Sequence, residues 1–405
     1  MDPLDILMNL DQVIPFYKPV ISADSRQVIG YEVVAYFRDP DGILQDLDWF
    51  FDDSSIPDDF RLEMNNYIQQ KAIDKLMEHD EPINLTFYYD ADLLTRDNGE
   101  ALLSILHTSQ ENGLDLNRIV VEIKDTYDTE QLDTLSNLIK YMKTIDVQIS
   151  LHVEQPNGSL DRLATIKPNI VKVDVGFLKD DLLPHLYRDV HHSLSMLSRK
   201  IGATLLFKGI SSYNQLNYAW RNGGQYYQGR YLKEPHEDFV APDCCQEIIE
   251  TNFRQFVSFE RRKVKAQLGL MEQLSQQFKS TLSAINPKDS YDDTILTIGD
   301  ACSDFAFRVY ICNVEGIQLS SNAQKNKEGG WELFQEGRNK NWSWRPYFFE
   351  NIIRMNVEKK GLLSDLYTDI EKDELIRTYS YPLSDELYVF LDIPYAYLYE
   401  QEGLL

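Results

Sequence analysis

Short apolar runs rich in β-branched residues alternate with longer amphipathic segments from Val13 to Tyr227. The apolar runs predict strands at Val13–Ile21, Val28–Tyr36, Ile83–Tyr88, Ile119–Ile123, Val147–Leu151, Ile170–Val173, Ala203–Phe207 and Tyr226–Tyr227. The amphipathic segments predict helices at Phe60–Glu78, Glu100–Glu111, Thr129–Lys143, Leu182–Lys200 and Ser212–Asn222. Such alternation is typical of a TIM-like (β/α) barrel. A doubly wound sheet is the alternative, although no glycine-rich phosphate fingerprint follows the first strand.

Charged and polar residues stand at the carboxyl ends of these predicted strands, where a (β/α) barrel builds its active site. The set consists of Glu32, Tyr88, Glu122, His152, Lys172, Asp174, Lys208 and Gln228. Glu32 is the one carboxylate in the apolar run Gly30–Tyr36. Because acidic side chains are rarely buried without a partner, Glu32 is predicted to bind a ligand or to form an ion pair.

One long helix is predicted for Asp243–Ala284, which contains no proline and a single glycine. From Val264 onward its apolar residues follow a pattern close to a heptad repeat, which favours a partner helix and a homodimer. Packing against its own chain is the alternative. The Asn286–Ser290 segment ends this helix. We therefore predict a barrel domain at 1–242, a connecting helix at 243–287 and a further domain at 288–405.

The last part of the chain is rich in aromatic residues and has alternating strand patterns at Phe305–Cys312, Leu375–Ser380 and Glu386–Ile393. We expect an α+β module with an antiparallel sheet. The net charge of −25 and the pI near 4.6 argue against a nucleic-acid-binding protein, which needs a basic face. No signal-peptide pattern and no long apolar run occur, so the expectation is a cytoplasmic protein without a membrane span.

Five short motifs resemble those of the EAL family, which are cyclic di-GMP phosphodiesterases built on a TIM-like barrel. They are Glu32-Val33-Val34, Val121-Glu122-Ile123, Val171-Lys172-Val173-Asp174, Lys208-Gly209-Ile210 and Gln228-Gly229-Arg230-Tyr231. Their order and spacing match over most of the predicted barrel. The later segments Asn341–Tyr347 and Tyr381–Leu383 resemble the PAS/Cache-like module of YkuI-type two-domain proteins.

The EAL resemblance implies two Mg²⁺ or Mn²⁺ ions, held by several carboxylates and an asparagine beside a lysine. Matching residues are Glu32, Glu122 and Lys172. The sequence departs from the pattern where the family has its asparagine, its paired aspartates, two further glutamates and a ligand-binding arginine. Those positions hold Tyr88, His152, Val153, Lys208, Ser211 and Tyr36.

Two carboxylates beside two lysines predict an ion-pair cluster with no metal cofactor. A single ion bound by Glu32, Glu122 and His152 is an alternative, and Mg²⁺ or Mn²⁺ is expected if any activity survives. The resulting hypothesis is a catalytically inactive scaffold or sensor. One alternative is a cyclic di-GMP receptor that uses Gln228, Lys172 and Lys208 without hydrolysis. An active cyclic di-GMP phosphodiesterase is the other.

A small-ligand site is also predicted in the C-terminal module. Arg345, Tyr347, Tyr367 and Asp369 resemble the elements with which some Cache sensors hold amino acids. An arginine pairs with a carboxylate through two hydrogen bonds, and an aspartate pairs with an amine. Structural roles for these four residues are the alternative.

Overall fold

The computed structural model describes residues 2–400 apart from 54, 80, 125–131, 154–158, 179–184, 284, 287, 346–347, 370 and 372. These residues form two compact units, 1–255 and 256–405. The long helix α10 (Gln246–Leu282) contributes to both units. Each unit is described separately below.

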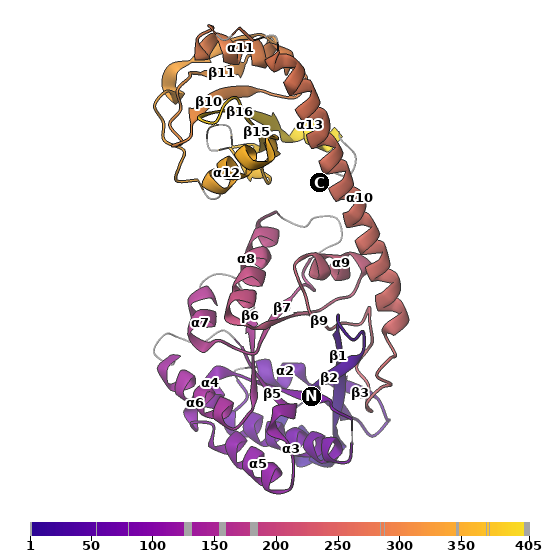
Figure 1. Cartoon of the computed structure of the whole chain (residues 1–405). Coiled ribbons are helices and arrows are strands. Elements are labelled where there is room, and N and C mark those ends of the chain that lie inside the picture. Colours follow the sequence, from indigo (N-terminus) through magenta and orange to yellow (C-terminus); the bar gives the residue numbers. More distant parts are fainter. Residues whose placement is uncertain are drawn as a thin grey trace. The chain divides into compact units, whose positions relative to one another are not determined.

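The first unit is a closed barrel, as the alternating sequence pattern predicts (Figure 1). Its described strands are β1 (Val13–Ser22), β2 (Val28–Arg38), β4 (Asn84–Tyr89), β5 (Ile119–Lys124), β6 (Gln148–Val153), β7 (Ile170–Asp174), β8 (Thr204–Lys208) and β9 (Tyr226–Tyr227). Neighbours pair in the order β1-β9-β8-β7-β6-β5-β4-β2, and pairing of β1 with β2 closes the barrel. β1 is antiparallel to both of its neighbours, and the short strand β3 (Leu44–Asp46) pairs with β2 outside the barrel.

Helices follow most of the barrel strands and surround them (Figure 1). The longer ones are α3 (Asp58–Met77), α5 (Glu100–Glu111), α6 (Leu132–Thr144), α7 (Ser159–Ile166), α8 (His185–Ile201) and α9 (Tyr213–Arg221). The short helices are α1 (Pro3–Met8), α2 (Asp48–Asp52) and α4 (Ala91–Arg96). Helix α2 lies in a segment for which the sequence pattern predicted no element, and it contributes to the site described below.

The second unit has an antiparallel sheet with strand order β12-β11-β10-β16-β15-β13. Its strands are β10 (Arg308–Asn313), β11 (Asn322–Lys325), β12 (Trp331–Phe334), β13 (Leu362–Leu363), β14 (Tyr367–Thr368), β15 (Leu375–Pro382) and β16 (Leu387–Pro394). The helices are α11 (Tyr291–Ala301), α12 (Phe348–Glu358) and α13 (Tyr395–Glu400). The expected α+β architecture with an antiparallel sheet is therefore confirmed.

The two faces of this sheet are used differently because successive side chains of a strand point to opposite sides. One face packs its apolar residues, including Ile311 and Leu391, against Leu274 and Phe278 of α10 and against α11. On the other face, α12 packs Phe348 and Ile352 around Tyr388 and Phe390. That second face carries the cavity described below.

The apolar repeat of α10 is used within the chain over its second half. Leu274 and Phe278 are buried in the core of the second unit. Val264 and Leu268, which begin the repeat, are about half exposed. Half of the repeat that favoured a partner helix is thus explained by packing within the chain, which was the alternative interpretation.

Candidate functional site

A layer of charged side chains lies above an apolar layer inside the barrel. The apolar layer contains Val20, Val120, Ile170 and Leu206 from four different strands. Residues two positions apart in a strand face the same side. Glu122, Lys172 and Lys208 therefore follow Val120, Ile170 and Leu206 into the barrel interior at the carboxyl ends of β5, β7 and β8.

Lys172 lies at the centre of this charged layer. Its Nζ donates hydrogen bonds to Glu122 Oε2 at 2.7 Å and to Glu32 Oε2 at 2.5 Å. The lysine is 1% exposed and Glu122 is 2% exposed. We call Glu32, Glu122 and Lys172 the lysine–carboxylate cluster. Buried charges of this kind are tolerated only when they are paired and hydrogen-bonded.

The electrostatics of the cluster follow from burial and charge pairing. Burial opposes the charge of Glu32, but attraction by Lys172, then by Lys18 and Lys208, outweighs it and lowers the pKa of Glu32. For Lys172, attraction by Glu122 and Glu32 likewise outweighs burial and raises the pKa. Burial raises the pKa of Glu122, because Lys172 offsets the loss of solvent only in part. The ammonium and the Glu32 carboxylate are therefore both charged at neutral pH.

His152 lies beside the cluster as a neutral ring. Its Nδ1 is 3.7 Å from Glu122 Oε1, which is beyond hydrogen-bond distance. Nε2 is buried and has no hydrogen-bond partner among the residues that the structure describes. Burial, with repulsion by Lys208 and Lys172, lowers the pKa of His152 to about 2. The ring therefore adds no positive charge to the site at neutral pH.

Two further lysines of the site, Lys208 and Lys18, form ion pairs with aspartates. The sequence suggested that Lys208 neutralises Glu32 and Glu122. Its ion pair is instead with Asp174, whose Oδ2 is 3.8 Å from Lys208 Nζ, and it attracts the two glutamates only at longer range. Lys18 Nζ lies 3.1 Å from Asp48 Oδ2 of α2. Lys18 was not among the predicted site residues, although the β1–β2 hairpin places it directly opposite Glu32. A lysine in the apolar run Val13–Ile21 was the signal that could have found it.

The cluster opens into a cavity of ≈160 Å³ at the carboxyl ends of the strands. The charged or polar residues that line it include Lys18, Glu32, Asp48, Asn65, Gln69, Tyr88, Glu122, Lys124, His152 and Lys208. Three lysines and three carboxylates thus face one small volume. Lys172 is not among the lining residues, because it lies beneath the two glutamates to which it is bonded.

Several predicted site residues do not line this cavity. The Gln228 side chain donates to the backbone oxygen of Lys18 at 3.3 Å. Tyr36 stacks on Phe16 with a ring-centroid distance of 4.3 Å. Val153, which is buried, and Ser211, whose hydroxyl donates to the Gln215 side chain, also lie outside the lining. The same holds for Asp174, which pairs with Lys208.

The residues present do not fit a pair of divalent ions. Magnesium and manganese need several oxygen ligands, and two such ions need several carboxylates to offset their charge. Here Glu32 and Glu122 both bind the Lys172 ammonium. On the strands next to these residues, Tyr88 pairs with Glu122 and His152 pairs with Lys172, and Lys208 follows on β8. None of these three side chains supplies a carboxylate. No group of three His, Cys, Asp or Glu side chains able to hold a metal ion occurs in the part of the chain that the structure describes.

A closed barrel with a glutamate within β2, a glutamate in β5 and a buried lysine in β7 is the arrangement expected of an EAL domain. The EAL-domain family model matches residues 4–235, and this chain belongs to that family. Residues 239–405 match the EAL-domain associated signalling protein domain. The expected two-domain family is thereby confirmed.

Among known proteins, the chain is similar to the EAL-domain containing protein YkuI of Bacillus subtilis, with 40% identity over the full length of both. It also resembles the crystal structure of Bacillus subtilis YkuI in complex with substrate c-di-GMP and calcium. That match has a TM-score of 0.94, 39% identity and full coverage of both chains. The EAL domain of FimX from Pseudomonas aeruginosa, bound to c-di-GMP, shares the fold. That match has 20% identity and a TM-score of 0.52, and it covers 60% of this chain and the whole chain of that EAL domain.

The predicted ligand residues of the second unit separate into two groups. Arg345 and Tyr367 line a cavity of ≈550 Å³ between the sheet and α12. Asp369 does not line it, since both of its carboxylate oxygens accept hydrogen bonds from Arg308, at 2.7 and 3.3 Å. Tyr347 lies outside the described residues.

In the described chain, no helix is long and apolar enough to cross a membrane.

Proposed function

We propose that this protein is an EAL-domain signalling protein that does not hydrolyse cyclic di-GMP and acts as a scaffold or sensor. One observation carries the proposal. Glu32 and Glu122, the two glutamates that match the metal-binding carboxylates of the EAL family, both bind the Lys172 ammonium. Hydrolysis by metal-activated water needs ions that polarise the phosphodiester. A site with two carboxylates already neutralised by a buried ammonium binds such ions poorly, so no metal cofactor is part of the proposal.

The test is chromatographic detection of the linear dinucleotide after incubation of the full chain with cyclic di-GMP and Mn²⁺ or Mg²⁺. We expect no product with either ion. The matched variant is Glu32→Gln, which removes a carboxylate and keeps the side-chain shape. Turnover in the wild-type chain that is lost in this variant would show an active cyclic di-GMP phosphodiesterase and overturn the proposal.

Cyclic di-GMP binding without hydrolysis is the second candidate. YkuI, at 39% identity over the full chain, has been crystallised with c-di-GMP. Lys18, Lys124 and Lys208 also line the barrel cavity of this chain, and lysines attract phosphate. Isothermal titration calorimetry in EDTA separates binding from catalysis. We expect saturable heat that Lys208→Met weakens by about tenfold or more.

Lys140→Met is the matched control, because Lys140 is exposed on α6, outside the cavity. An equal loss in both variants would indicate attraction by overall charge alone. Absence of heat in the wild-type chain would remove this candidate and leave the scaffold role in place.

We keep the dimer expected from the sequence as part of the proposal and place its contact on the part of α10 that precedes Leu270. Val257, Val264 and Leu268 are exposed there. Light scattering after gel filtration is expected to give a dimer mass that Leu268→Glu lowers toward the monomer. Gln276→Glu, at an exposed position further along the same helix, is the control. A monomeric wild-type chain would remove the dimer from the proposal.

A further inference from the structure

A cavity of the second unit has the features of a built site. It measures ≈550 Å³, which is within the range of small-molecule pockets. The sheet supplies Tyr310, Cys312, Thr378, Ser380 and Phe390, and α12 supplies Phe348, Asn351 and Arg354. Trp342 and Arg345 close it from the segment before α12, and Tyr367 closes it from β14. Six of the sixteen lining residues are aromatic and eight are polar or charged.

The aromatic walls are held in place by contacts among themselves. Tyr310 and Phe390 stack at 5.3 Å with an interplanar angle of 10°. Phe348 stacks on Phe390 at 6.3 Å from the α12 side. Trp342 donates its indole N–H to Gln318 Oε1 at 3.0 Å, and Gln318 is completely buried. The cavity thus presents fixed, flat apolar surfaces, which suit a flat apolar ligand.

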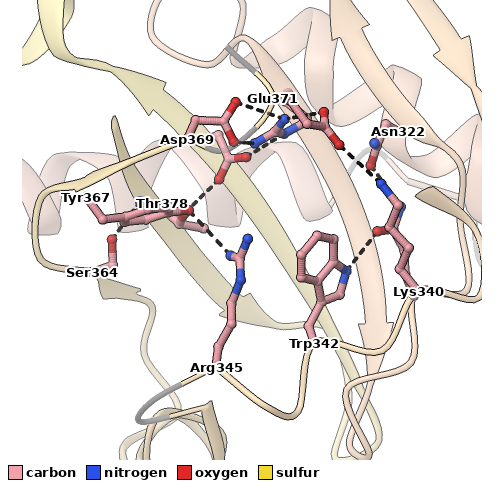
Figure 2. Close-up of polar contacts among 12 residues, drawn as sticks. Asn322, Lys340, Trp342, Arg345, Ser364, Tyr367, Asp369, Glu371 and Thr378 are labelled. Atoms are coloured by element: carbon pink, nitrogen blue, oxygen red, sulfur yellow. Dashed lines mark hydrogen bonds and ion pairs between the residues drawn. The ribbon is translucent and has the colours of Figure 1, made fainter. Parts of the chain in front are cut away.

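Arg345 supplies the available charge in this cavity. Its guanidinium stacks over Trp342 at 4.2 Å, a cation–π contact that fixes the plane of the group. Its hydrogen bond to Tyr367 Oη is long, at 3.5 Å (Figure 2). No ion pair joins Arg345 to a carboxylate among the described residues. Most of its five N–H donors therefore remain for a ligand.

Asp392, the carboxylate behind Arg345, already accepts hydrogen bonds at both of its oxygens. Thr378 Oγ1 donates to Asp392 Oδ1 at 2.6 Å. Tyr367 Oη lies 2.6 Å from Thr378 Oγ1, and Figure 2 shows these two side chains. The other oxygen of Asp392 accepts a hydrogen bond from Arg308 at 2.6 Å. Because Thr378 spends its proton on Asp392, the Tyr367 hydroxyl donates to Thr378. Asp392 is thus engaged by Arg308 and Thr378 and is completely buried, so it is not presented to a ligand.

We propose that this cavity binds a small aromatic carboxylate, with the carboxylate held by Arg345 and the ring held against Trp342, Tyr310 and Phe390. An arginine fork matches a carboxylate through two parallel hydrogen bonds. The chemistry differs from the amino-acid ligand that Arg345 and Asp369 suggested in sequence. Asp369 is occupied by Arg308, and the one carboxylate that lines the cavity, Asp365, is fully exposed.

The test compares three probes that share one ring system: indole-3-acetate, neutral indole and zwitterionic tryptophan. Binding to the full chain is measured by isothermal titration calorimetry. We expect saturable binding of indole-3-acetate, with indole and tryptophan each weaker by about tenfold or more. Tryptophan binding as tightly as indole-3-acetate, or no saturable binding of indole-3-acetate, would overturn the proposal.

Two variants assign the contacts. Arg345→Gln is expected to weaken indole-3-acetate binding by about tenfold or more, while indole binding stays unchanged. Arg354→Gln is the matched control, because Arg354 also lines the cavity but forms an ion pair with Glu358 at 2.8 Å. Equal losses in both variants would contradict the assignment to Arg345.

A third variant keeps the proposal testable if Arg345→Gln unfolds the domain. Ser380→Leu fills the cavity from β15 and leaves every charge in place. We expect it to abolish binding of indole-3-acetate with unchanged circular dichroism. Undiminished binding would place the ligand elsewhere on the chain and overturn the proposal.

Discussion

The Lys172 ammonium lies 2.7 Å from the Glu122 carboxylate, and both side chains are buried among the strands of the barrel. Glu32 binds the same ammonium from β2, which is separated from β5 by β4 in the sheet. The cluster therefore joins strands that are far apart in sequence, β2, β5 and β7. It stabilises the barrel only as a complete set, because a buried carboxylate without its lysine is costly.

Replacement of Lys172 by methionine is expected to destabilise the first unit by about 3–5 kcal/mol, the cost of breaking a buried ion pair. Urea unfolding followed by circular dichroism measures the change. Lys208→Met is the control, since Lys208 and Asp174 are 3.8 Å apart and partly exposed. Its expected cost is below about 1 kcal/mol. Equal costs would mean that the Lys172 contacts contribute no more than a surface pair.

The inward charged residues of the barrel could be predicted from the sequence on the parallel strands, whose direction the alternation of strands and helices indicates. Glu122, Lys172 and Lys208 each follow an inward apolar residue by two positions on strands that run parallel. Lys18 precedes its inward neighbour Val20, because β1 runs antiparallel to β2 and β9. A residue pattern gives the period of a strand but not its direction in the sheet, so Lys18 was missed.

Interactions between distant segments were the part that the sequence could not supply. Arg308 binds Asp369 and Asp392, which are 61 and 84 residues away. No local spacing rule connects such residues, and the charge of each is consistent with an exposed position. Asp369 consequently looked like a ligand group in sequence, whereas folding places it against Arg308.

Gly209, in the Lys208-Gly209-Ile210 motif, is required by backbone conformation and by space. Its φ is +76°, and an added Cβ would lie 2.6 Å from Asp174 Oδ1 and 2.8 Å from the Gly176 nitrogen. Gly202 has the same φ with open space around it. We expect Gly202→Ala to cost about 1–2 kcal/mol from the left-handed conformation alone. Gly209→Ala is expected to cost about 1–3 kcal/mol more from overpacking.

Thermal or urea unfolding of the two alanine variants measures the difference directly. The comparison isolates the crowding at Gly209, because both variants have the same free-energy cost of placing alanine at a positive φ. Matching unfolding free energies for the two variants would show that Asp174 and Gly176 move aside at little cost.

The buried His191 predicts a pH dependence of stability. Its Nδ1 lies 2.7 Å from Tyr218 Oη, and burial lowers its pKa from 6.5 to about 4. Between these two values the unfolded chain binds a proton that the folded chain does not. Stability therefore falls as the pH falls through this window, by about 1.4 kcal/mol per pH unit at full effect. His191→Phe is expected to remove this part of the slope.

Urea titrations at several pH values between 6.5 and 4 measure that slope. Tyr218→Phe is the control, because it removes the hydroxyl and keeps the buried ring of His191. We expect its slope to match the wild-type slope while its overall stability is lower. A His191→Phe slope equal to that of the wild-type chain would show that the imidazole is protonated in the folded state.

Arg308 holds together the polar interior of the second unit. It binds Asp392, Asp369 and Glu371 at 2.6, 2.7 and 2.9 Å, and the first two carboxylates are buried. Arg308→Met is expected to destabilise this unit by about 3–5 kcal/mol, because it leaves both buried carboxylates unpaired. Hydrogen exchange measured by mass spectrometry localises the loss to the strands β10, β15 and β16. Arg354→Met, which breaks the exposed pair with Glu358, is expected to cost below about 1 kcal/mol. Unchanged exchange in Arg308→Met would mean that Asp369 and Asp392 become protonated or solvated at little cost.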